Sequence, residues 1–455
     1  MKNQLVIFGT GKYGEEAYEL LHNEHTIQCF ADNNPKKIST TFHGIEVVAP
    51  SALPQKQKEG TDILVAIHAH RDVGGQLDEM GIRNYYIYQN GVIYRNHIRG
   101  SQIKRCNRCI MDDSSDEYIL FDENGFCNYC NGAMKLKSHI YYPNDEGKRQ
   151  LDLKLEEIKK HGRGKKYDCI MGLSGGLDSS YLAYLGYKWG LRVLAVHIDD
   201  GYDTEVSKSN LAKIIKKTGF DYKVICPDDE QYNALTLAYM KAGVPNIAVP
   251  QDNILFAYLY KLIRENHLKY FLSGGNFALE CILQMGNTHD AFDIRNLFHI
   301  HKMFGNRPID KLEFISSEQR KRDAEEFGIE SPRLLNYVEY NRNRAMEELR
   351  EFCGFEYYGR KHLENILTAF IQLYWFPKKF GVDKRTSHLS SMIMSGQMTR
   401  EEAMQLLEEP LYDANQMEEY IGIIKGRMKI DDHEFERIMN DTVHRHEDYD
   451  HECSF

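Results

Sequence analysis

The first hundred residues alternate between short apolar runs and one amphipathic stretch. Residues 14–24 repeat apolar positions every three to four residues, which predicts a helix with one buried face. Four apolar runs have the length and composition of strands, and they cover residues 4–10, 26–34, 62–69 and 82–89. This alternation predicts a small Rossmann-like α/β domain over residues 1–100.

A second and larger alternation begins near residue 150. Apolar runs predict strands over 167–173, 191–201, 221–227 and 268–276. Helical periodicity follows two of these strands, over 179–190 and 205–219. Strands separated by helices predict a doubly wound parallel sheet, on which ligands bind at the carboxyl ends of the strands. We expect this α/β domain to cover residues 150–330.

Beyond residue 330 the pattern becomes helical, as in residues 399–410 and 417–428. We expect a helical part over 331–430 that completes the active site. Residues 431–455 are rich in Asp, Glu and His, which predicts a solvated tail. The alternative is metal capture by His444 and His446.

Composition and charge narrow the class of protein. A chain of 455 residues with 42% hydrophobic and 27% charged residues is typical of a globular protein with two or three domains. No apolar run has the length of a membrane span and no signal-peptide pattern is evident, so we expect a cytoplasmic protein. The formal charge of −10 disfavours nucleic acid as a partner, although a local basic groove stays open. A homodimer is compatible with the sequence.

The ten cysteines fall into two groups. Six stand alone, which suits a reducing compartment rather than disulfides: Cys29, Cys169, Cys226, Cys281, Cys353 and Cys453. The other four form two CxxC pairs separated by seventeen residues: Cys106, Cys109, Cys127 and Cys130. Each pair can hold one side of a tetrahedral ion, and four thiolates leave no open position. We predict a structural Zn²⁺ ribbon over residues 101–135.

A GxGxxG motif follows the first predicted strand. Its glycines are Gly9, Gly11 and Gly14, and Asp32 follows the second strand. In such units the glycines let the backbone approach a phosphate, and the acidic residue binds a ribose hydroxyl. This predicts a nucleotide or nucleotide-sugar site, against the alternative that the glycines serve only the turn.

The sequence SGGLDSS lies between a predicted strand and a predicted helix of the larger domain. Ser174, Gly175 and Gly176 leave successive backbone N–H groups facing one concavity, which is a nest for anions at a helix N-terminus. Ser174 and Ser179 add hydroxyl donors, whereas the Asp178 carboxylate would repel phosphate unless Mg²⁺ lies between them. The loop lacks the lysine of the GxxxxGK[ST] motif. We predict a loop that holds phosphate with Mg²⁺, against the alternative of a plain glycine turn.

This SGGxDS loop resembles the pyrophosphate-binding loop of the ATP pyrophosphatases, which include asparagine, GMP and NAD synthetases. The resemblance implies that ATP is cleaved to AMP and pyrophosphate while a substrate oxygen is adenylated. It places Asp199, in HIDDGYDTE, at the adenosine, and Gly274, in LSGGNFALE, at a second glycine turn. Glu280 would complete the Mg²⁺ site with Asp178 or take a proton from ammonia; the alternative is a surface ion pair.

Cations for this chemistry must come from outside the loop, because the loop itself supplies none. Lys361, His362, Lys384 and Arg385 stand near aromatic residues in the helical part. Separating AMP from pyrophosphate develops negative charge that cations stabilise. We predict catalytic roles for these four residues, above all for Lys384 and Arg385, against the alternative of a solvated basic face.

Three motifs together resemble the N-acetyl sugar amidotransferases of bacterial surface-polysaccharide biosynthesis, such as that of lipopolysaccharide. They are CNRC…CNYC, SGGLDSS and KKFGVDKRTSHLSS…SGQMTREEA, between residue 104 and about residue 410. The resemblance implies an enzyme that uses ATP and ammonia to convert the acetamido group of a free or nucleotide-linked sugar into an acetamidino group. The N-terminal segment, with IFGTGKYGEEA, is similar to small nucleotide-sugar-binding modules.

Ammonia must then come from another protein. No glutaminase domain is evident, and the chain opens Met1-Lys2 without a cysteine that could serve as an N-terminal nucleophile. We expect a separate glutaminase subunit as partner, with a channel protein as a further candidate.

Two rival functions stay open. A tRNA thiolation enzyme can also combine a cysteine ribbon with such a loop, but it would need a basic RNA face and a reactive cysteine. Cys226 and Cys281 lie in strand-like contexts, where we expect them to be buried. The second rival is a nucleotide-sugar-binding scaffold without ATP chemistry, which conflicts with the intact Ser174, Asp178 and Ser179.

Overall fold

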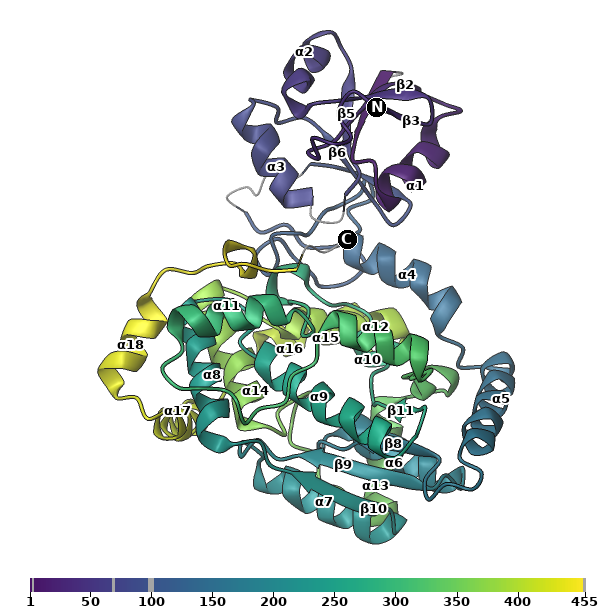
Figure 1. Ribbon diagram of the computed structural model, residues 1–455, viewed down its shortest axis with the longest axis vertical. Coiled ribbons are helices and arrows are strands. Elements are labelled where there is room, and N and C mark those ends of the chain that lie inside the picture. The colour runs from purple at the N-terminus through teal and green to yellow at the C-terminus, as the bar shows by residue number, and fades with distance from the viewer. Residues whose placement is uncertain (2–3, 68–69, 97–101, 453–455) are drawn as a thin grey trace. The chain divides into compact units, whose positions relative to one another are not determined.

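The computed structural model describes residues 1, 4–67, 70–96 and 102–452 (Figure 1). The chain divides into two compact units, Met1–Leu136 and Lys137–Phe455. Cys453 lies outside the described residues. Within the described part of the chain, no helix combines the length and the apolar character needed to cross a bilayer.

The first unit is built on one sheet with the strand order β3-β4-β2-β1-β5-β6-β7. Its strands are β1 Gln4–Phe8, β2 Thr26–Ala31, β3 Thr41–Phe42, β4 Ile45–Val48, β5 Asp62–Val65, β6 Tyr86–Gln89 and β7 Val92–Arg95. Its helices are α1 Lys12–Leu21, η1 Pro50–Ala52, α2 Leu53–Lys58 and α3 His70–Glu79. The central pairs are parallel, and β3–β4 and β6–β7 are antiparallel. The predicted Rossmann-like organisation is confirmed.

Both faces of this sheet are covered, which explains why its central strand is apolar throughout. Val6 and Phe8 of β1 enter one hydrophobic cluster, and Leu5 and Ile7 enter the other. Side chains alternate between the two faces of a strand, so a strand with both faces buried needs apolar residues at every position.

The second unit contains a four-stranded parallel sheet with the order β10-β9-β8-β11. Its strands are β8 Cys169–Gly172, β9 Val193–Ile198, β10 Asp221–Ile225 and β11 Phe271–Leu272. The predicted parallel sheet is confirmed. From β8 the chain adds β9 and β10 on one side of β8, and it then adds β11 on the other side. The loop after β8 therefore lies at the topological switch point of the sheet, which is where such sheets bind ligands.

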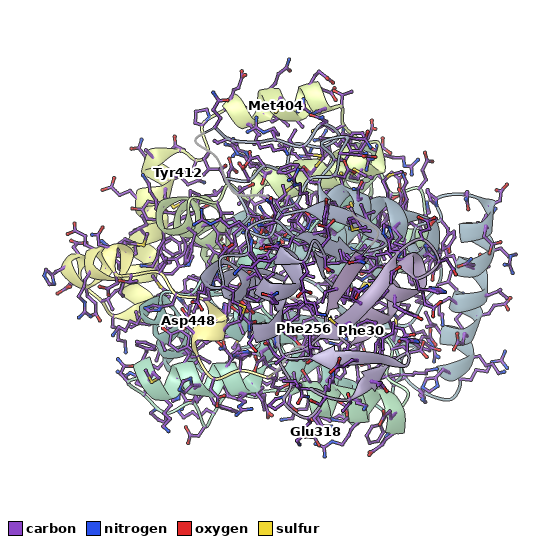
Figure 2. All side chains as sticks on the ribbon, turned by 90° about the horizontal axis from the view of Figure 1, so that it is seen from above. Phe30, Phe256, Glu318, Met404, Tyr412 and Asp448 are labelled. Carbon is purple, nitrogen blue, oxygen red and sulfur yellow. The ribbon has the colours of Figure 1, made fainter. Side chains whose placement is uncertain are left out.

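The helices of the second unit supply the cover of the sheet and a separate helical core. The helix α4 begins in the first unit and ends in the second. The helices are α4 Asn128–Ile140, α5 Asp145–His161, α6 Leu177–Lys188, α7 Glu205–Thr218, α8 Asp229–Ala242, α9 Val249–Glu265, α10 Phe277–Glu280, η2 Met285–Asn287, α11 Ile294–Phe304, α12 Ser317–Glu326, η3 Leu334–Tyr337, α13 Arg342–Cys353, α14 Ile366–Phe370, the π-helix η4 Ile371–Phe380, α15 Arg385–Ser395, α16 Arg400–Glu408, α17 Ala414–Met428, α18 Asp432–Asn440 and η5 His446–Asp448. Phe256 of α9, labelled in Figure 2, packs against Phe271 and Phe292 in the core beside the sheet. The helical core is centred on the fully buried Trp375, whose indole N–H donates to the Val244 carbonyl.

The acidic C-terminal segment is folded, so the solvated tail predicted from its composition is wrong for its described part. Phe435, Ile438 and Tyr449 are buried in the helical core, and the Tyr449 hydroxyl donates to the Ala242 carbonyl at 2.7 Å. A few apolar anchors outweigh the average composition of the segment because each contributes about 1.5–3 kcal/mol on burial. His446 stacks on His289 and His444 lies beside Asp448, and within the described residues neither histidine belongs to a group of three metal-ligating side chains, so metal capture there has no support.

The burial of His446 gives the protein an acid-sensitive anchor. Burial and the neighbouring His289 lower the pKa of His446 well below its ordinary value, so the folded ring is neutral. The unfolded ring binds a proton below about pH 6.5, so this contribution to stability is present above that pH and is lost as the pH falls below it. We expect the melting temperature to fall between about pH 7 and pH 5.5, and to fall less in His446→Gln. An equal slope in both proteins would contradict this origin.

Candidate nucleotide and group-transfer site

The SGGLDSS loop joins β8 to α6, and its glycines are required by close contacts. Gly175 has φ +75°, and a Cβ there would lie 2.5 Å from the Ser207 hydroxyl. That hydroxyl donates to the Ser174 carbonyl at 2.8 Å, which holds the loop against α7. A Cβ on Gly274 would lie 2.8 Å from the Asp178 carbonyl carbon and from the Ser179 nitrogen. The two glycine turns predicted from the sequence therefore meet at the start of α6.

Hydroxyl groups lie over the backbone donors of this loop. The Ser174 and Ser179 oxygens are 3.2 Å apart, and the Gly176 N–H donates to the Ser174 oxygen at 3.2 Å. The Leu177 N–H donates to the Tyr358 hydroxyl at 2.9 Å. An anion at the N-terminus of α6 would thus meet N–H and O–H donors, as the prediction of a phosphate loop requires.

A cavity of about 500 Å³ opens over the carboxyl ends of the strands. Much of its polar lining comes from both glycine turns, from the end of β9 and the segment after it, and from residues before α14: Ser174, Ser179, Ser273, Gly274, His197, Asp200, Asp203, His362, Glu364 and Asn365. Asp199 is half-buried near this edge, and its carboxylate accepts from the Gly201 N–H at 2.9 Å.

Lys361 reaches the loop from far along the chain. Its Nζ lies 2.6 Å from Asp178 Oδ2 and 3.0 Å from Glu280 Oε1, so a cation joins the two carboxylates predicted to hold Mg²⁺. Tyr340 donates its hydroxyl proton to the other Asp178 oxygen. Burial opposes the charged form of Lys361, but Asp178 and Glu280 outweigh it and raise its pKa. Burial is the largest influence on Glu280 and raises its pKa, but Lys361, His362 and the Asn276 N–H together lower that pKa below its ordinary value, so Glu280 is a carboxylate beside the charged Lys361.

Two imidazoles adjoin this ion cluster. His362 adopts a left-handed backbone conformation with φ +62°, and its Nε2 lies 3.7 Å from Glu280 Oε1. Its ring meets that of His388 edge-on at 5.7 Å between centroids. Burial and the charge of Lys361 lower the pKa of His362, and burial together with His362, Lys384 and Lys361 lowers that of His388 well below its ordinary value. Both rings are therefore neutral proton acceptors near pH 7.

A second cavity, of about 200 Å³, lies on the other side of these residues. Asp178, Lys361, His388 and Arg385 line it together with Arg342, Arg360, Tyr357, Tyr358, Leu389 and Met392. The guanidinium of Arg342 lies over the Tyr357 ring at 4.8 Å. His362 lines the first cavity and His388 lines the second, so the two imidazoles connect them.

The structure places the four predicted cations differently from one another. Lys361 contacts Asp178 of the loop, and His362 lines the first cavity. Arg385 lines the second cavity, but its guanidinium is paired with Asp383 at 2.7 Å and donates to the Leu406 and Glu409 carbonyls. Lys384 lines neither cavity and donates to Asn287 at 2.8 Å. The roles favoured for Lys384 and Arg385 stay predictions, whereas Lys361 is the cation in direct contact with Asp178.

Glu364 was not predicted, although it is one of the most constrained polar residues at the loop. Its Oε1 accepts from the Ser174 hydroxyl at 3.3 Å, and its Oε2 is buried without a hydrogen-bond partner in the described chain. Its backbone carbonyl accepts from the Thr204 N–H at 3.0 Å. No motif surrounds this residue in the sequence, so only the fold could reveal it.

In the first unit the GxGxxG glycines serve close packing. A Cβ on Gly9 would lie 2.6 Å from the Ala66 carbonyl oxygen, and one on Gly14 would lie 2.1 Å from that of Gly9. Gly11, in contrast, has open space around it. Asp32 accepts from the Thr10 hydroxyl and from Lys37 at 3.3 Å, which holds the loop closed on itself. A ligand at this turn stays a prediction.

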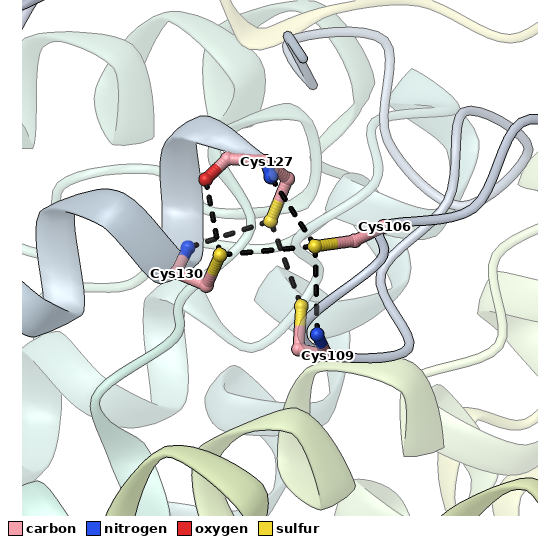
Figure 3. Close-up of side chains that lie close together, drawn as sticks. All are labelled: Cys106, Cys109, Cys127 and Cys130. Atoms are coloured by element: carbon pink, nitrogen blue, oxygen red, sulfur yellow. Dashed lines mark hydrogen bonds between the residues drawn. The ribbon is translucent and has the colours of Figure 1, made fainter. Parts of the chain in front are cut away.

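The four paired cysteines meet in a buried cluster (Figure 3). Sγ–Sγ distances are 3.7 Å for Cys106–Cys130 and 3.6 Å for Cys109–Cys127, close to the value of about 3.8 Å that tetrahedral Zn–S bonds give. The Cys127 N–H points at the Cys106 sulfur at 3.2 Å, as amides do around metal thiolates. Four converging soft donors fit Zn²⁺ or an iron–sulfur cluster.

Cys226 and Cys281 are the candidate reactive cysteines of a tRNA thiolation enzyme. The prediction that both are buried is wrong. Cys226 is exposed, because it follows β10, an edge strand whose residues are mostly exposed. Cys281 is only partly buried, next to the Ser391 carbonyl. Although Cys226 is exposed, partial desolvation and the nearby Asp199 raise the pKa of its thiol, so the thiol is not activated.

The parallel sheet with the SGGLDSS loop at its switch point and the buried cysteine cluster define an α/β protein with an N-terminal Rossmann-like unit. Residues 364–455 match the family described as LPS biosynthesis protein WbpG-like, C-terminal domain, and residues 1–88 match the family described as C2185-like, N-terminal. The C-terminal match confirms the predicted resemblance to surface-polysaccharide biosynthesis proteins. It begins at Glu364 and includes both Lys384 and Arg385.

Similar proteins were found among curated sequences and solved structures. The uncharacterized protein MJ1599 of Methanocaldococcus jannaschii is 22% identical over 67% of this chain and 94% of its own length. A glutamine-hydrolysing GMP synthase of Pyrobaculum aerophilum is 39% identical over 18% of this chain and 16% of its own. The structure of the U34-tRNA thiolase NcsA of Methanococcus maripaludis, with its [4Fe-4S] cluster, aligns with a TM-score of 0.29 at 14% identity, over 67% of this chain and 89% of that one.

Proposed function

We propose that the protein is an ATP-dependent amidotransferase that acts on an N-acetyl sugar in the synthesis of a surface glycan such as lipopolysaccharide. The observation that carries this proposal is the Asp178–Lys361–Glu280 cluster at the SGGLDSS loop: Ser174 and Ser179 of the loop line the first cavity, and Asp178 and Lys361 line the second. One cavity has the size and donors for ATP. The other offers aromatic, cationic and neutral imidazole side chains to an acceptor. The WbpG-like match supports the glycan context.

In the first step the acetamido oxygen attacks the α-phosphorus of ATP, and the bond from that phosphorus to the β-phosphate oxygen breaks. The Gly176 and Leu177 N–H groups and the Ser174 and Ser179 hydroxyls hold the pyrophosphate end. Lys361 is close enough to stabilise the charge that develops on the departing pyrophosphate. The product is an O-adenylated imidate.

The residues at the loop fit Mg²⁺. The Glu364 carboxylate lies beside the predicted phosphate site, where its Oε1 accepts from the Ser174 hydroxyl. Its buried Oε2 has no hydrogen-bond donor in the described chain. Two negative groups this close need a cation between them. When bound, Mg²⁺ supplies charge neutralisation on the phosphate oxygens. Glu364 is a better-placed ligand than Glu280, because Lys361 already neutralises Glu280.

In the second step ammonia attacks the imidate carbon, the bond from that carbon to the AMP oxygen breaks, and nitrogen loses a proton. His388 lines the acceptor cavity as a neutral imidazole, and His362 connects it to the nucleotide cavity. They are the proton acceptors of this proposal. Ammonia comes from a separate glutaminase, with or without a channel protein. The first unit is a nucleotide-sugar-binding module in this proposal, and its cysteines hold Zn²⁺.

Pyrophosphate release tests the proposal. With ATP, ammonium and UDP-N-acetyl sugars, we expect pyrophosphate and AMP, and a sugar product in which NH replaces the amide oxygen by mass spectrometry. Asp178→Ala is expected to reduce turnover at least about 100-fold; because it also removes one partner of the Lys361 ion pair, it should lower the melting temperature, and the assay is run where melting shows the variant folded. Release of ADP and phosphate would exclude adenylation, and no release with any sugar would favour a binding scaffold.

Glu364→Gln tests the Mg²⁺ assignment without turnover. The affinity for a non-hydrolysable α,β-methylene ATP should rise with Mg²⁺ in the parent protein. In the variant we expect this Mg²⁺-dependent gain to shrink about tenfold or more, with the affinity measured without Mg²⁺ little changed. An unchanged Mg²⁺ dependence would remove Glu364 from the site.

The tRNA thiolation alternative is disfavoured by the unactivated Cys226. Tight tRNA binding that weakens with a steep salt dependence would revive it.

A further inference from the structure

Three metal-binding side chains converge where β9 ends, at the rim of the nucleotide cavity. His197 is the penultimate residue of β9, and Asp199 and Asp203 lie in the segment that leads to α7. One ligand atom from each lies within 4.8 Å of the others. His197 and Asp203 are buried, with 5% and 8% exposure, and Asp199 is half-buried.

The imidazole of His197 is oriented as in metal sites. Its Nδ1 lies 2.8 Å from the Leu173 carbonyl oxygen, which can only accept, so Nδ1 carries a proton. Nε2 is therefore the atom that faces the two carboxylates. A metal-bound histidine normally donates its other ring N–H to a carbonyl or carboxylate in this way, which fixes the ring.

Asp203 supplies an independent sign of a missing ligand. Its Oδ2 lies 2.7 Å from His197 Nε2, within ion-pair distance of a protonated imidazole, but no hydrogen bond to this oxygen is formed in the described chain. The atom is thus buried without a hydrogen-bond partner in the described chain. A buried carboxylate oxygen without a donor is costly, and a cation among the three side chains would remove that cost.

We propose that His197, Asp199 and Asp203 bind one divalent transition-metal ion, without requiring nucleotide. One imidazole nitrogen with two carboxylates suits Mn²⁺, Fe²⁺ or Zn²⁺ better than Mg²⁺, which prefers oxygen ligands. The ion binds His197 Nε2 in place of any proton on that nitrogen. Metal binding therefore releases this proton. Because His197 Nδ1 donates to the Leu173 carbonyl, an ion bound at Nε2 would also hold Leu173 in place. Leu173 immediately precedes Ser174 of the loop. This site does not rest on the proposed sugar chemistry.

Titration with MnCl₂ tests the site. Zinc-loaded protein without nucleotide, followed by the electron paramagnetic resonance signal of free Mn²⁺, is expected to bind one Mn²⁺ per chain. Asp199→Asn and Asp203→Asn should each weaken binding about tenfold or more. Asp199 is half-buried, so its variant tests the site even if Asp203→Asn unfolds, which thermal melting would reveal.

Two controls separate other metal sites. Glu19→Gln alters the exposed group of Glu15, Glu19 and His43 in the first unit and should change nothing. Glu280→Gln alters the ion cluster at the loop and should also leave Mn²⁺ binding unchanged. The proposal is overturned if no Mn²⁺ binds without ATP, if Asp199→Asn binds it as the parent does, or if Glu280→Gln weakens it.

Discussion

Replacing Lys361 with Met is expected to reduce pyrophosphate release at least about 100-fold and to destabilise the second unit by about 3 kcal/mol. The variant leaves the Asp178 and Glu280 carboxylates close together without the cation that now joins them at 2.6 and 3.0 Å. Removing one partner of a buried ion pair costs about 3–5 kcal/mol, and the partial exposure of Glu280 favours the lower end of that range. A pyrophosphate-release assay would measure the first effect, and denaturant unfolding would measure the second.

A surface lysine provides the matched control for this experiment. Lys213 lies 2.6 Å from Glu356, but the Glu356 side chain is 67% exposed. Exposed pairs contribute about 0–1 kcal/mol, so Lys213→Met should leave stability and turnover nearly unchanged. If Lys361→Met and Lys213→Met behave alike, the assignment of Lys361 to the reaction fails.

Removal of the metal from the cysteine cluster is expected to unfold or strongly loosen the first unit. Structural Zn²⁺ contributes on the order of 10 kcal/mol to the folding of small domains, and the four sulfurs are fully buried here. Cys106→Ser should therefore lower the zinc content and the melting temperature of this unit together. Elemental analysis and calorimetry of the whole chain would follow both.

Cys29→Ser is the control, because Cys29 is a lone buried cysteine of β2 in the same unit. It should retain full zinc content. Iron with a visible absorption band in place of zinc would identify an iron–sulfur cluster. An unchanged melting curve for the metal-free protein would show that the cluster has no structural role.

The predictions that succeeded rest on patterns that local physics imposes. The loop at Ser174 is recognisable because its small residues are required by contacts at Gly175 and Gly274, and the cysteine pairs because tetrahedral sites need that spacing. The central strands β8 and β9 were predictable because both of their faces are buried, which leaves uninterrupted apolar runs.

The residues that were missed or misjudged depend on contacts between distant parts of the chain. Lys361 and Lys384 carry the same chemistry in sequence, and only the left-handed turn at His362 and the course of the chain bring Lys361 to Asp178. Glu364 has no motif around it. The C-terminal segment looked solvated because its three apolar anchors are sparse, although the helical core provides a place for each.

The presence of two cavities, one lined by His362 and the other by Lys361 and His388, has a consequence for inhibitor design. A compound that fills the cavity beside Tyr357, Tyr358 and Met392 does not have to resemble ATP. Since we propose that ATP occupies the larger cavity, such a compound should not compete directly with the nucleotides of a cell and should avoid features shared with ATP-binding proteins. The smaller cavity is therefore the more selective target.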